Sequence, residues 1–574
     1  MKADRVLING TIFSIDANGE RKNGNAVAIK DEKIIAVGTD RDILRLAGDG
    51  TEVIDCNRKT ILPGLCDSHC HATWAASFFH SCNLFDVRLV TDETTEDVIA
   101  KYLEKLKKYI QDNQERKIIR GIGWNPAYFN GASGQYRMPT RHDLDQICPE
   151  KPVVLESYCQ HHLWVNTKAL ELAGIDASIK TPSSGEITRE ENGYPQGVFS
   201  EMAAMDLIKK RIEGFDYRVD EYKETILKYQ REFANPYGIT LIQDALCTEN
   251  AKKAYMELAK EERLTMRVRG VHHIDRDTAD EDMKSLLTDK GMYDAGDLYR
   301  IETGKIFVEG EYCLLEPYEP EIAVYLGKPC GYKGTPFWTQ QELSRTISNI
   351  WKAGYSVHLH AMGDASVKLS VDAIEAAGLE SEKSGRDVIA HLMLVPDTYF
   401  EKMGAMDLIC ACQPRWAIYD TETEQSIIPA FGKKRAMNCY PIGRLERAGC
   451  TLSFGTDFPV TPPPNPFHGI QCAMTRSVFS NLSDYETYKG LVLGEEGDLH
   501  RDCVTLEMAV KALSYGGAYQ MFLETVTGTI EIGKSADITI LNSDLEKINI
   551  KEFSQITVNK TIFKGEIVYD SERM

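Results

Sequence analysis

The sequence predicts an α/β protein in which a (β/α)8 barrel is joined to a small β domain and an inserted subdomain. Between residues 61 and 525, short apolar runs alternate with helix-length segments, the pattern of a parallel sheet with helical crossovers. Eight such runs match the number of strands that closes this kind of barrel. The candidate strands are Ile61–Cys66, Ile239–Asp244, Arg267–His273, Lys305–Glu309, Ser356–His360, Val388–His391, Leu408–Gln413 and Thr451–Asp457.

The two ends of the chain differ from the middle, because both consist of short β-like runs separated by turn signals. We therefore expect residues 1–60 and 526–574 to form one composite β-sandwich domain, with the barrel spanning 61–525. The stretch between the first two candidate barrel strands is far too long for one crossover helix. Residues from roughly 75 to 230 are accordingly expected to contain an inserted subdomain.

Composition restricts the class of protein. The chain has 574 residues, more than one core usually holds, and 66 basic against 86 acidic residues give a net charge of −20. This charge disfavours a general binder of nucleic acid or of anionic membranes. The N-terminus lacks a signal-like apolar core and no long uncharged apolar stretch follows, so we expect a cytoplasmic protein. The 15 scattered cysteines are typical of free thiols in a reducing compartment.

The segment Asp67–His71 is the strongest chemical signal. His69 and His71 are spaced i, i+2 at the end of an apolar run, so on a strand they point to the same side. Their α-carbons would lie about 7 Å apart, close enough for both imidazoles to reach one metal ion at about 2.0–2.1 Å. A structural zinc site made with Cys66 and Cys70 is disfavoured, because a second pair of Cys or His ligands at suitable spacing is missing.

Three further metal-capable residues end later candidate strands, namely His360, His391 and Asp457. In a barrel these ends meet at one rim, where nitrogen and oxygen ligands of this kind suit zinc. Each also has a structural interpretation. A single histidine at a strand end often only hydrogen-bonds, Asp457 could cap the proline-rich turn that follows, and His358 shares a face with His360 and competes for its role.

These residues lie in motifs that resemble those of a known family. Pro63-Gly64-Leu65-x-Asp67-x-His69-x-His71, His360–Asp364, Ile389–His391 and Gly455–Val460 resemble the metal motifs of the amidohydrolase superfamily, and specifically of the amidohydrolase 3 family. That family includes deformylases of N-substituted formamides. The resemblance spans nearly the whole chain and implies the fold of a metal-dependent-hydrolase barrel.

The resemblance also implies a ligand set. Lys305 matches the family's bridging lysine, which reacts with carbon dioxide to form a carbamate. His69, His71 and Asp457 would then bind one ion, and His360 and His391 the other. Zinc is the first candidate, with manganese and iron as alternatives. The chain departs from the family at Glu309, where aspartate is frequent, and around His161, where the family more often has Gly-His and a small residue.

The function implied by the resemblance is hydrolysis of a C–N bond in an amide, formamide or cyclic amide. A metal-activated hydroxide would attack the substrate carbon, with Asp457 as general base and then general acid. Two alternatives remain open: a one-metal deaminase of a nitrogen heterocycle, and a metal-binding protein without catalysis. A phosphoester hydrolase is disfavoured, because no glycine-rich phosphate loop accompanies the site.

Residues on the substrate side are harder to predict. Trp124, His161 and Trp416 are candidates, although a tryptophan in an apolar run usually belongs to the core. The pair His272-His273 ends the third candidate strand and is either substrate-facing or structural. We expect a small-molecule substrate, and the sequence leaves the oligomeric state open, with a homodimer as one candidate.

Overall fold

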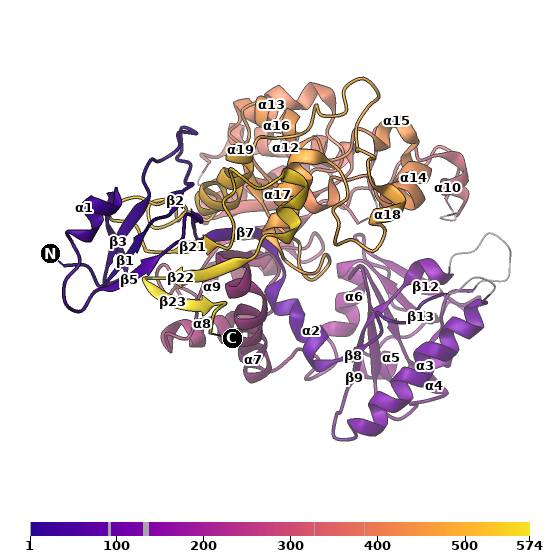
Figure 1. Cartoon of the computed structure of the whole chain (residues 1–574). Coiled ribbons are helices and arrows are strands. Elements are labelled where there is room, and N and C mark those ends of the chain that lie inside the picture. Colours follow the sequence, from indigo (N-terminus) through magenta and orange to yellow (C-terminus); the bar gives the residue numbers. More distant parts are fainter. Residues whose placement is uncertain are drawn as a thin grey trace.

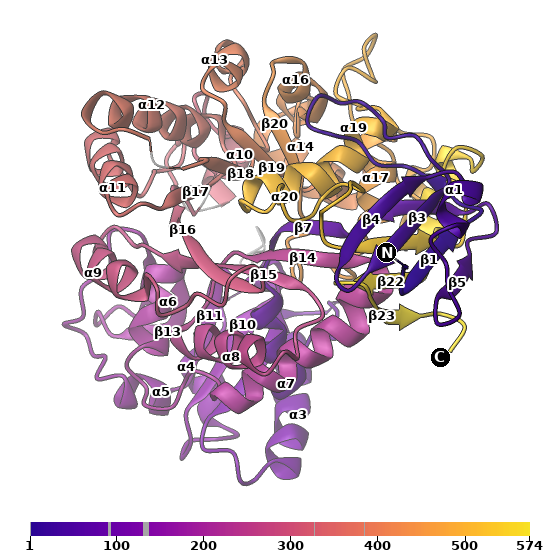
Figure 2. The same cartoon turned by 90° about the vertical axis from the view of Figure 1, so that its left-hand side faces the viewer.

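The centre of the protein is an eight-stranded parallel sheet (Figures 1 and 2) in which each strand pairs with the next along the chain. The computed structural model describes residues 2–89, 93–129, 137–310, 312–325, 328–383 and 385–573. The strands are β7 (Leu65–Cys70), β14 (Ile239–Asp244), β15 (Arg267–His273), β16 (Tyr299–Phe307), β17 (Ser356–Ala361), β18 (Val388–His391), β19 (Ile409–Cys412) and β20 (Thr451–Phe454). The predicted (β/α)8 architecture is confirmed.

Helices connect successive strands on the outside of this sheet, and local sequence explains where several of them begin. The Thr248 side chain accepts the Ala251 N–H at the start of α8, and Thr339 and Glu342 form a capping box at the start of α11. The main helices are α7 (Val219–Tyr229), α8 (Glu249–Lys260), α9 (Ala279–Asp289), α10 (Pro320–Tyr325), α11 (Gln340–Lys352), α12 (Asp364–Glu380), α13 (Phe400–Ala405), α14 (Ile428–Phe431), α15 (Lys433–Ala436), α16 (Ile442–Arg447), α17 (Pro466–Thr475), α18 (Tyr485–Tyr488), α19 (Leu506–Lys511) and α20 (Gly517–Gln520).

The first and last barrel strands meet at their carboxyl ends. The Asp457 N–H donates to the His69 carbonyl at 2.8 Å, and the His71 N–H donates to the Phe458 carbonyl at 2.6 Å. Gly455 permits this approach, because a Cβ there would lie 2.6 Å from the His69 nitrogen. The barrel is therefore joined at the edge where its candidate site lies.

The run Ile61–Cys66, predicted as the first barrel strand, belongs to two different sheets. β6 (Thr60–Pro63) pairs with strands of a separate sheet, and the barrel strand begins only at Leu65. Gly64 lies at the change of sheet, where a Cβ would collide with the Thr240 hydroxyl at 2.0 Å. The prediction failed because both sheets bury this run, so apolar character alone does not mark the boundary.

Strands from both ends of the chain make two small sheets beside the barrel (Figure 2), and one apolar cluster joins residues of both sheets. The first has the order β4-β3-β1-β5 and the second β2-β6-β21-β22-β23. Their bounds are β1 (Arg5–Ile8), β2 (Thr11–Ile12), β3 (Ala26–Lys30), β4 (Lys33–Gly38), β5 (Glu52–Asp55), β21 (Ile538–Leu541), β22 (Val558–Phe563) and β23 (Glu566–Asp570), with α1 (Asp40–Leu44) beside the first sheet. The domain boundaries at residues 60 and 526 stay a prediction.

The long segment between β7 and β14 contains a six-stranded sheet of its own (Figure 1), in the order β12-β13-β11-β10-β9-β8. Its elements are α2 (Ala75–His80), β8 (Cys82–Asn83), α3 (Thr95–Asp112), β9 (Ile119–Trp124), α4 (Arg141–Asp145), β10 (Val153–Ser157), β11 (His162–Val165), α5 (Thr167–Leu172), β12 (Glu186–Arg189), β13 (Pro195–Ser200) and α6 (Met202–Lys209). The limits of 75–230 for an inserted subdomain stay a prediction. Among the described helices, none has both the length and the apolar character needed to cross a bilayer.

Candidate metal centre

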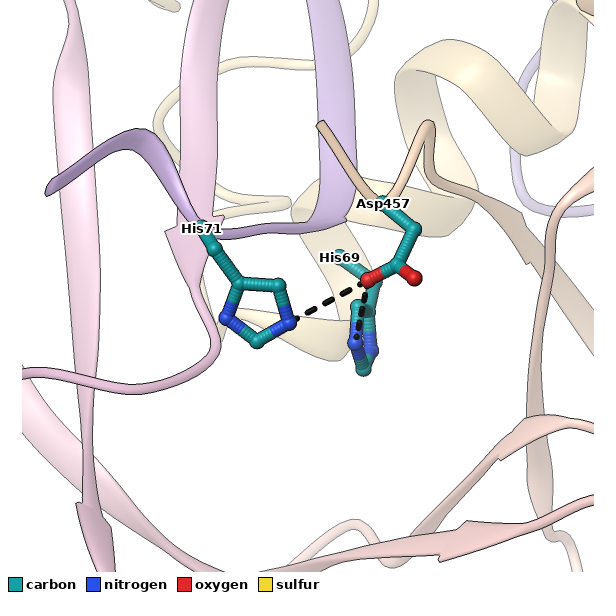
Figure 3. Close-up of side chains that lie close together, drawn as sticks. All are labelled: His69, His71 and Asp457. Carbon is teal, nitrogen blue, oxygen red and sulfur yellow. Dashed lines mark ion pairs between the residues drawn. The ribbon is translucent and has the colours of Figure 1, made fainter. Parts of the chain in front are cut away.

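Three side chains from the joined edge of the barrel converge in Figure 3. His69 and His71 come from the end of β7, and Asp457 follows β20. The Asp457 Oδ1 atom lies 3.3 Å from His69 Nε2 and 3.2 Å from His71 Nε2. Among the described residues, no other group of three or more His, Cys, Asp or Glu side chains has ligand atoms that all lie within 4.8 Å of one another. This is the spacing expected of donors around one ion.

The surroundings of these atoms favour a ligand over packing. The His69 Nε2 and Asp457 Oδ1 atoms are buried and form no hydrogen bond in the described structure, although unpartnered buried polar atoms are costly. Asp457 and His391 also have positive φ angles of 56° and 78°, which residues other than glycine rarely adopt. Such strain is concentrated at functional sites. The donor set and its unpaired atoms therefore fit a divalent cation.

His360 and His391 lie beside this group. The ring centroids of His69 and His391 are 4.7 Å apart, and those of His360 and His391 are 4.5 Å apart. The Nδ1 atom of His391 is 2.8 Å from the Gln413 Oε1 atom. Because this amide oxygen can only accept a hydrogen bond, the His391 proton lies on Nδ1. The lone pair of Nε2 is then free to bind a metal.

His358 lies in the barrel interior, next to His69. Its Nε2 atom is 2.8 Å from His69 Nδ1, and its Nδ1 atom is 3.1 Å from the Gln243 Oε1 atom. Unlike His360, it is not part of the cavity wall. The geometry thus places His360 at the site and gives His358 contacts that fix the orientation of His69.

Lys305 is fully buried on β16, and its Nζ atom has no hydrogen-bond partner among the described residues. Burial lowers the pKa of Lys305 to about 7, against the opposing effect of Asp457. A neutral amine is the form that reacts with carbon dioxide. Lys305 lies opposite His358 in the β16–β17 register, and Phe307 lies opposite His360.

Burial also favours the neutral form of His69, His360 and His391. It is the largest cause that lowers the pKa of His69 and His360 well below the ordinary value, and it lowers the pKa of His391 to about 4. Neutral imidazole is the form that binds metals. These three imidazoles are therefore in the form that ligation needs.

One cavity of about 320 Å³ contains all the predicted ligand positions in its wall. Its lining also includes aromatic and charged groups from the inserted segment and from loops after the barrel strands. The wall consists of His69, His71, Trp74, Tyr158, Cys159, Gln160, His161, Met202, Lys305, Phe307, Tyr312, His360, Met362, His391, Arg415, Trp416, Asp420, Glu422, Thr423, Ile427, Tyr440, Asp457 and Val460.

His161 lines this cavity and is held by Glu201, a residue that the sequence did not single out. The His161 Nδ1 atom is 2.9 Å from a Glu201 carboxylate oxygen, and the Glu201 N–H donates to the His161 carbonyl. Burial alone would lower the pKa of His161, but the Glu201 carboxylate outweighs it and raises the pKa to about 9. Glu201 has a positive φ of 66° and packs against Gly310, where a Cβ would lie 2.3 Å from its carboxyl carbon.

The two predicted tryptophans have different surroundings. Trp416 lines the cavity and stacks on His391, with ring centroids 5.5 Å apart. Trp124 lies instead in an apolar cluster of the inserted segment, and its indole N–H donates to the Leu155 carbonyl. The expectation that Trp124 faces the substrate therefore disagrees with its position. Its apolar surroundings in the sequence already offered the core interpretation.

His272 and His273 do not line the main cavity. The His272 Nδ1 atom lies 2.6 Å from Asp289 Oδ2 and 2.9 Å from Lys252 Nζ, in a buried polar cluster. His273 lines a smaller cavity together with Glu201. The structural interpretation is therefore favoured for His272.

Glu309, one of the departures from the expected pattern, supports the loop after β17. Its carboxylate accepts the backbone N–H groups of Cys313, Met362 and Gly363, and burial, opposed by these bonds, raises its pKa to about 7. The added methylene of glutamate is thus accommodated within a network of backbone hydrogen bonds. Sequence spacing gave no signal for these contacts.

Comparison with known proteins agrees with this geometry. The family model described as the amidohydrolase family matches residues 52–569. The chain belongs to the amidohydrolase family. It is accordingly a hydrolase, which disfavours the alternative of a metal-binding protein without catalysis.

Relatives of this amidohydrolase cover nearly its whole length. N-substituted formamide deformylase from Arthrobacter pascens is 24% identical, with 99% of this chain and 98% of that protein aligned. The YtcJ protein of Bacillus subtilis is 26% identical, with 98% of each chain aligned. The crystal structure of an uncharacterized metal-dependent hydrolase from Pyrococcus furiosus has a TM-score of 0.66 and 25% identity, over 93% of this chain and 98% of that one.

Proposed function

We propose that this amidohydrolase cleaves a C–N bond of a small amide, formamide or cyclic amide at a centre of two divalent cations. His69, His71 and Asp457 would hold one cation, and His360 and His391 the other, with a carbamate of Lys305 between them. The observation that supports this most is that all six residues line one cavity, in which the His69 Nε2, Lys305 Nζ and Asp457 Oδ1 atoms are buried without a hydrogen-bond partner among the described residues. Zinc suits the donors best, with manganese and iron as alternatives.

The cations and several residues of the chain would have separate roles in such a reaction. The cations, when bound, would polarise the substrate carbonyl and lower the pKa of a water molecule. Asp457 would accept the proton of that water and deliver it to the leaving nitrogen. His161, which contacts Glu201, would donate a hydrogen bond to the substrate, and Trp416 stacks on His391. The aromatic residues that line the cavity would restrict access of bulk water.

The relative from Arthrobacter pascens indicates a first substrate class to test, N-substituted formamides. Wild-type protein, His69→Ala and Asp457→Asn should be compared for metal content and for formamide hydrolysis. We expect His69→Ala to lose metal and activity, and Asp457→Asn to lose activity. His142→Ala, an exposed histidine on the inserted segment, is the matched control and should change neither. Full hydrolysis by metal-free Asp457→Asn would refute the mechanism.

A one-metal deaminase of a nitrogen heterocycle is the second candidate. It is favoured by the fact that His69, His71 and Asp457 are, within the described part of the chain, the one group of three or more His, Cys, Asp or Glu side chains whose ligand atoms lie within 4.8 Å of one another. One cation per chain, an unmodified Lys305 and release of ammonia would support it. Two cations and formate release would support the deformylase-like reaction.

A further inference from the structure

A second set of residues in the cavity wall has a chemistry unrelated to metal ligation. It consists of Glu422 with three tyrosines, Tyr158, Tyr312 and Tyr440, and we call it the tyrosine–glutamate pocket. Tyr158 follows β10 in the inserted segment, Tyr312 follows β16, and the other two lie between β19 and β20. The fold thus brings these four side chains together from three separate parts of the chain.

Glu422 lines the same cavity as the three tyrosines. Burial is the main cause that raises the pKa of each tyrosine, and the negative charge of Glu422 contributes to each of these shifts. Tyr440 lies against Trp416 with ring centroids 6.3 Å apart, and Tyr312 lies against Phe431 at 5.3 Å. The pocket therefore adjoins Trp416, which stacks on His391.

No positive side chain of the described residues forms an ion pair with Glu422, whose carboxylate is near the Ser426 hydroxyl. The other charged groups in this part of the wall have partners. Asp420 accepts the Thr423 N–H at 3.1 Å and is near Arg415, whose guanidinium lies 5.0 Å from the Phe479 ring centroid. Glu422 thus adds a negative charge that the surrounding protein leaves without a cationic partner.

A carboxylate among aromatic rings is suited to an organic cation. Ring faces attract ammonium groups, and the carboxylate of Glu422, a solvent-exposed residue of the cavity wall, adds charge complementarity. The same surroundings disfavour an anionic group, which would face Glu422. A purely apolar group would leave the carboxylate desolvated and without a partner.

We propose that the tyrosine–glutamate pocket binds a positively charged ammonium group of the substrate. The substrate class is then an amide or formamide that carries a second, cationic nitrogen beyond the bond that is cleaved. This inference rests on the proposed function for the reaction at the metal centre, but binding of the cation can be measured without turnover.

The binding test uses the full-length, metal-loaded protein and two small probes. Choline carries a quaternary ammonium group that cannot bind a metal, and 3,3-dimethylbutan-1-ol is its neutral carbon analogue. Binding is followed by the fluorescence of Trp74 and Trp416, which line the cavity, and by calorimetry. We expect choline to bind roughly tenfold more tightly than the neutral alcohol, the ratio that one cation–π and charge contact provides.

Variants identify the residues responsible. Glu422→Gln should reduce choline affinity to that of the neutral alcohol, whereas Glu424→Gln, which removes the same charge two residues away and outside the cavity wall, should not. Tyr158→Leu provides a second test, because this tyrosine is 41% exposed and its loss should leave the fold intact. Equal affinities of the two probes for the wild-type protein, or equal losses in Glu422→Gln and Glu424→Gln, would overturn the proposal.

A hydrolysis experiment separates this inference from the proposed function. N-substituted formamides with and without a distal trimethylammonium group are compared, and we expect kcat/KM to favour the cation roughly tenfold in the wild-type protein but not in Glu422→Gln. Glu422-dependent choline binding without hydrolysis of either formamide would contradict the proposed function alone. Hydrolysis of both formamides at equal rates by both proteins would contradict the cation pocket alone.

Discussion

The hydrogen bond between Gln413 and His391 permits a quantitative test of the metal centre. Gln413→Leu keeps a side chain of similar size but removes the oxygen that lies 2.8 Å from His391 Nδ1. His391 is 3% exposed and Gln413 is 1% exposed, so water cannot replace the lost acceptor. Leaving the Nδ1–H group unpartnered costs about 1–3 kcal/mol, which corresponds to metal binding weaker by about 5- to 150-fold.

Competition with a chelator measures this affinity directly. The matched control is Gln230→Leu, since Gln230 is also buried but donates to the Arg263 carbonyl in a different part of the protein. The control should lower stability without changing metal affinity. If Gln413→Leu binds metal as tightly as the wild-type protein, His391 is not oriented by this bond and its proposed role as a ligand loses its support.

Three further predictions concern stability and substrate contact. Gly64→Ala should lower the free energy of unfolding, measured in urea, by about 1–3 kcal/mol, because the added methyl group collides with Thr240 of β14. Gly378→Ala in α12 is the control: open space surrounds Gly378, so this variant should be neutral or slightly stabilising. Trp124→Ala should lower the free energy of unfolding by about 3–5 kcal/mol, because the missing side chain leaves a cavity in the core. Trp416→Ala should mainly change KM, because Trp416 lines the main cavity. The reverse pattern would contradict the positions of the two tryptophans. Burial would raise the pKa of Asp289, but its hydrogen bonds to a histidine and a lysine outweigh this and lower it. This carboxylate therefore stabilises the fold at a pH above its unfolded pKa of about 3.9, and the stabilisation is lost as the pH falls through the lower folded pKa. Asp289→Asn should lower the free energy of unfolding at neutral pH and make its decrease in acid shallower. An unchanged acid transition would contradict this.

The candidate ligands could be predicted from sequence because their geometry is local. His69 and His71 share one strand face by alternation, and His360, His391 and Asp457 each follow a recognisable apolar run. Parallel strands then bring these ends to one edge of the barrel. Lys305 carries no such local signal, since an isolated lysine usually lies at the surface, and only the family resemblance indicated it.

The supporting residues could not be predicted, because their partners are distant in sequence. Glu201 and His161 lie next to the ends of two paired strands of the inserted sheet, and Gln413 and His391 lie at the ends of two adjacent barrel strands. Glu422 lies in a loop where no periodic pattern constrains it. The change of sheet at Gly64 was missed for a related reason, since contact with Thr240 is a tertiary constraint that an apolar run does not reveal.

The joined edge of the barrel has a thermodynamic consequence for the whole chain. The backbones of His69 and Asp457 hydrogen-bond to each other at the meeting of the first and last strands, and both side chains are proposed ligands of one cation. A cation bound there would bind the folded state alone, so at a free concentration of 100 times its Kd it would add about 2.7 kcal/mol to the free energy of unfolding. Chelation would then lower the melting temperature as well as the activity, and the size of that change would report the metal affinity without any substrate.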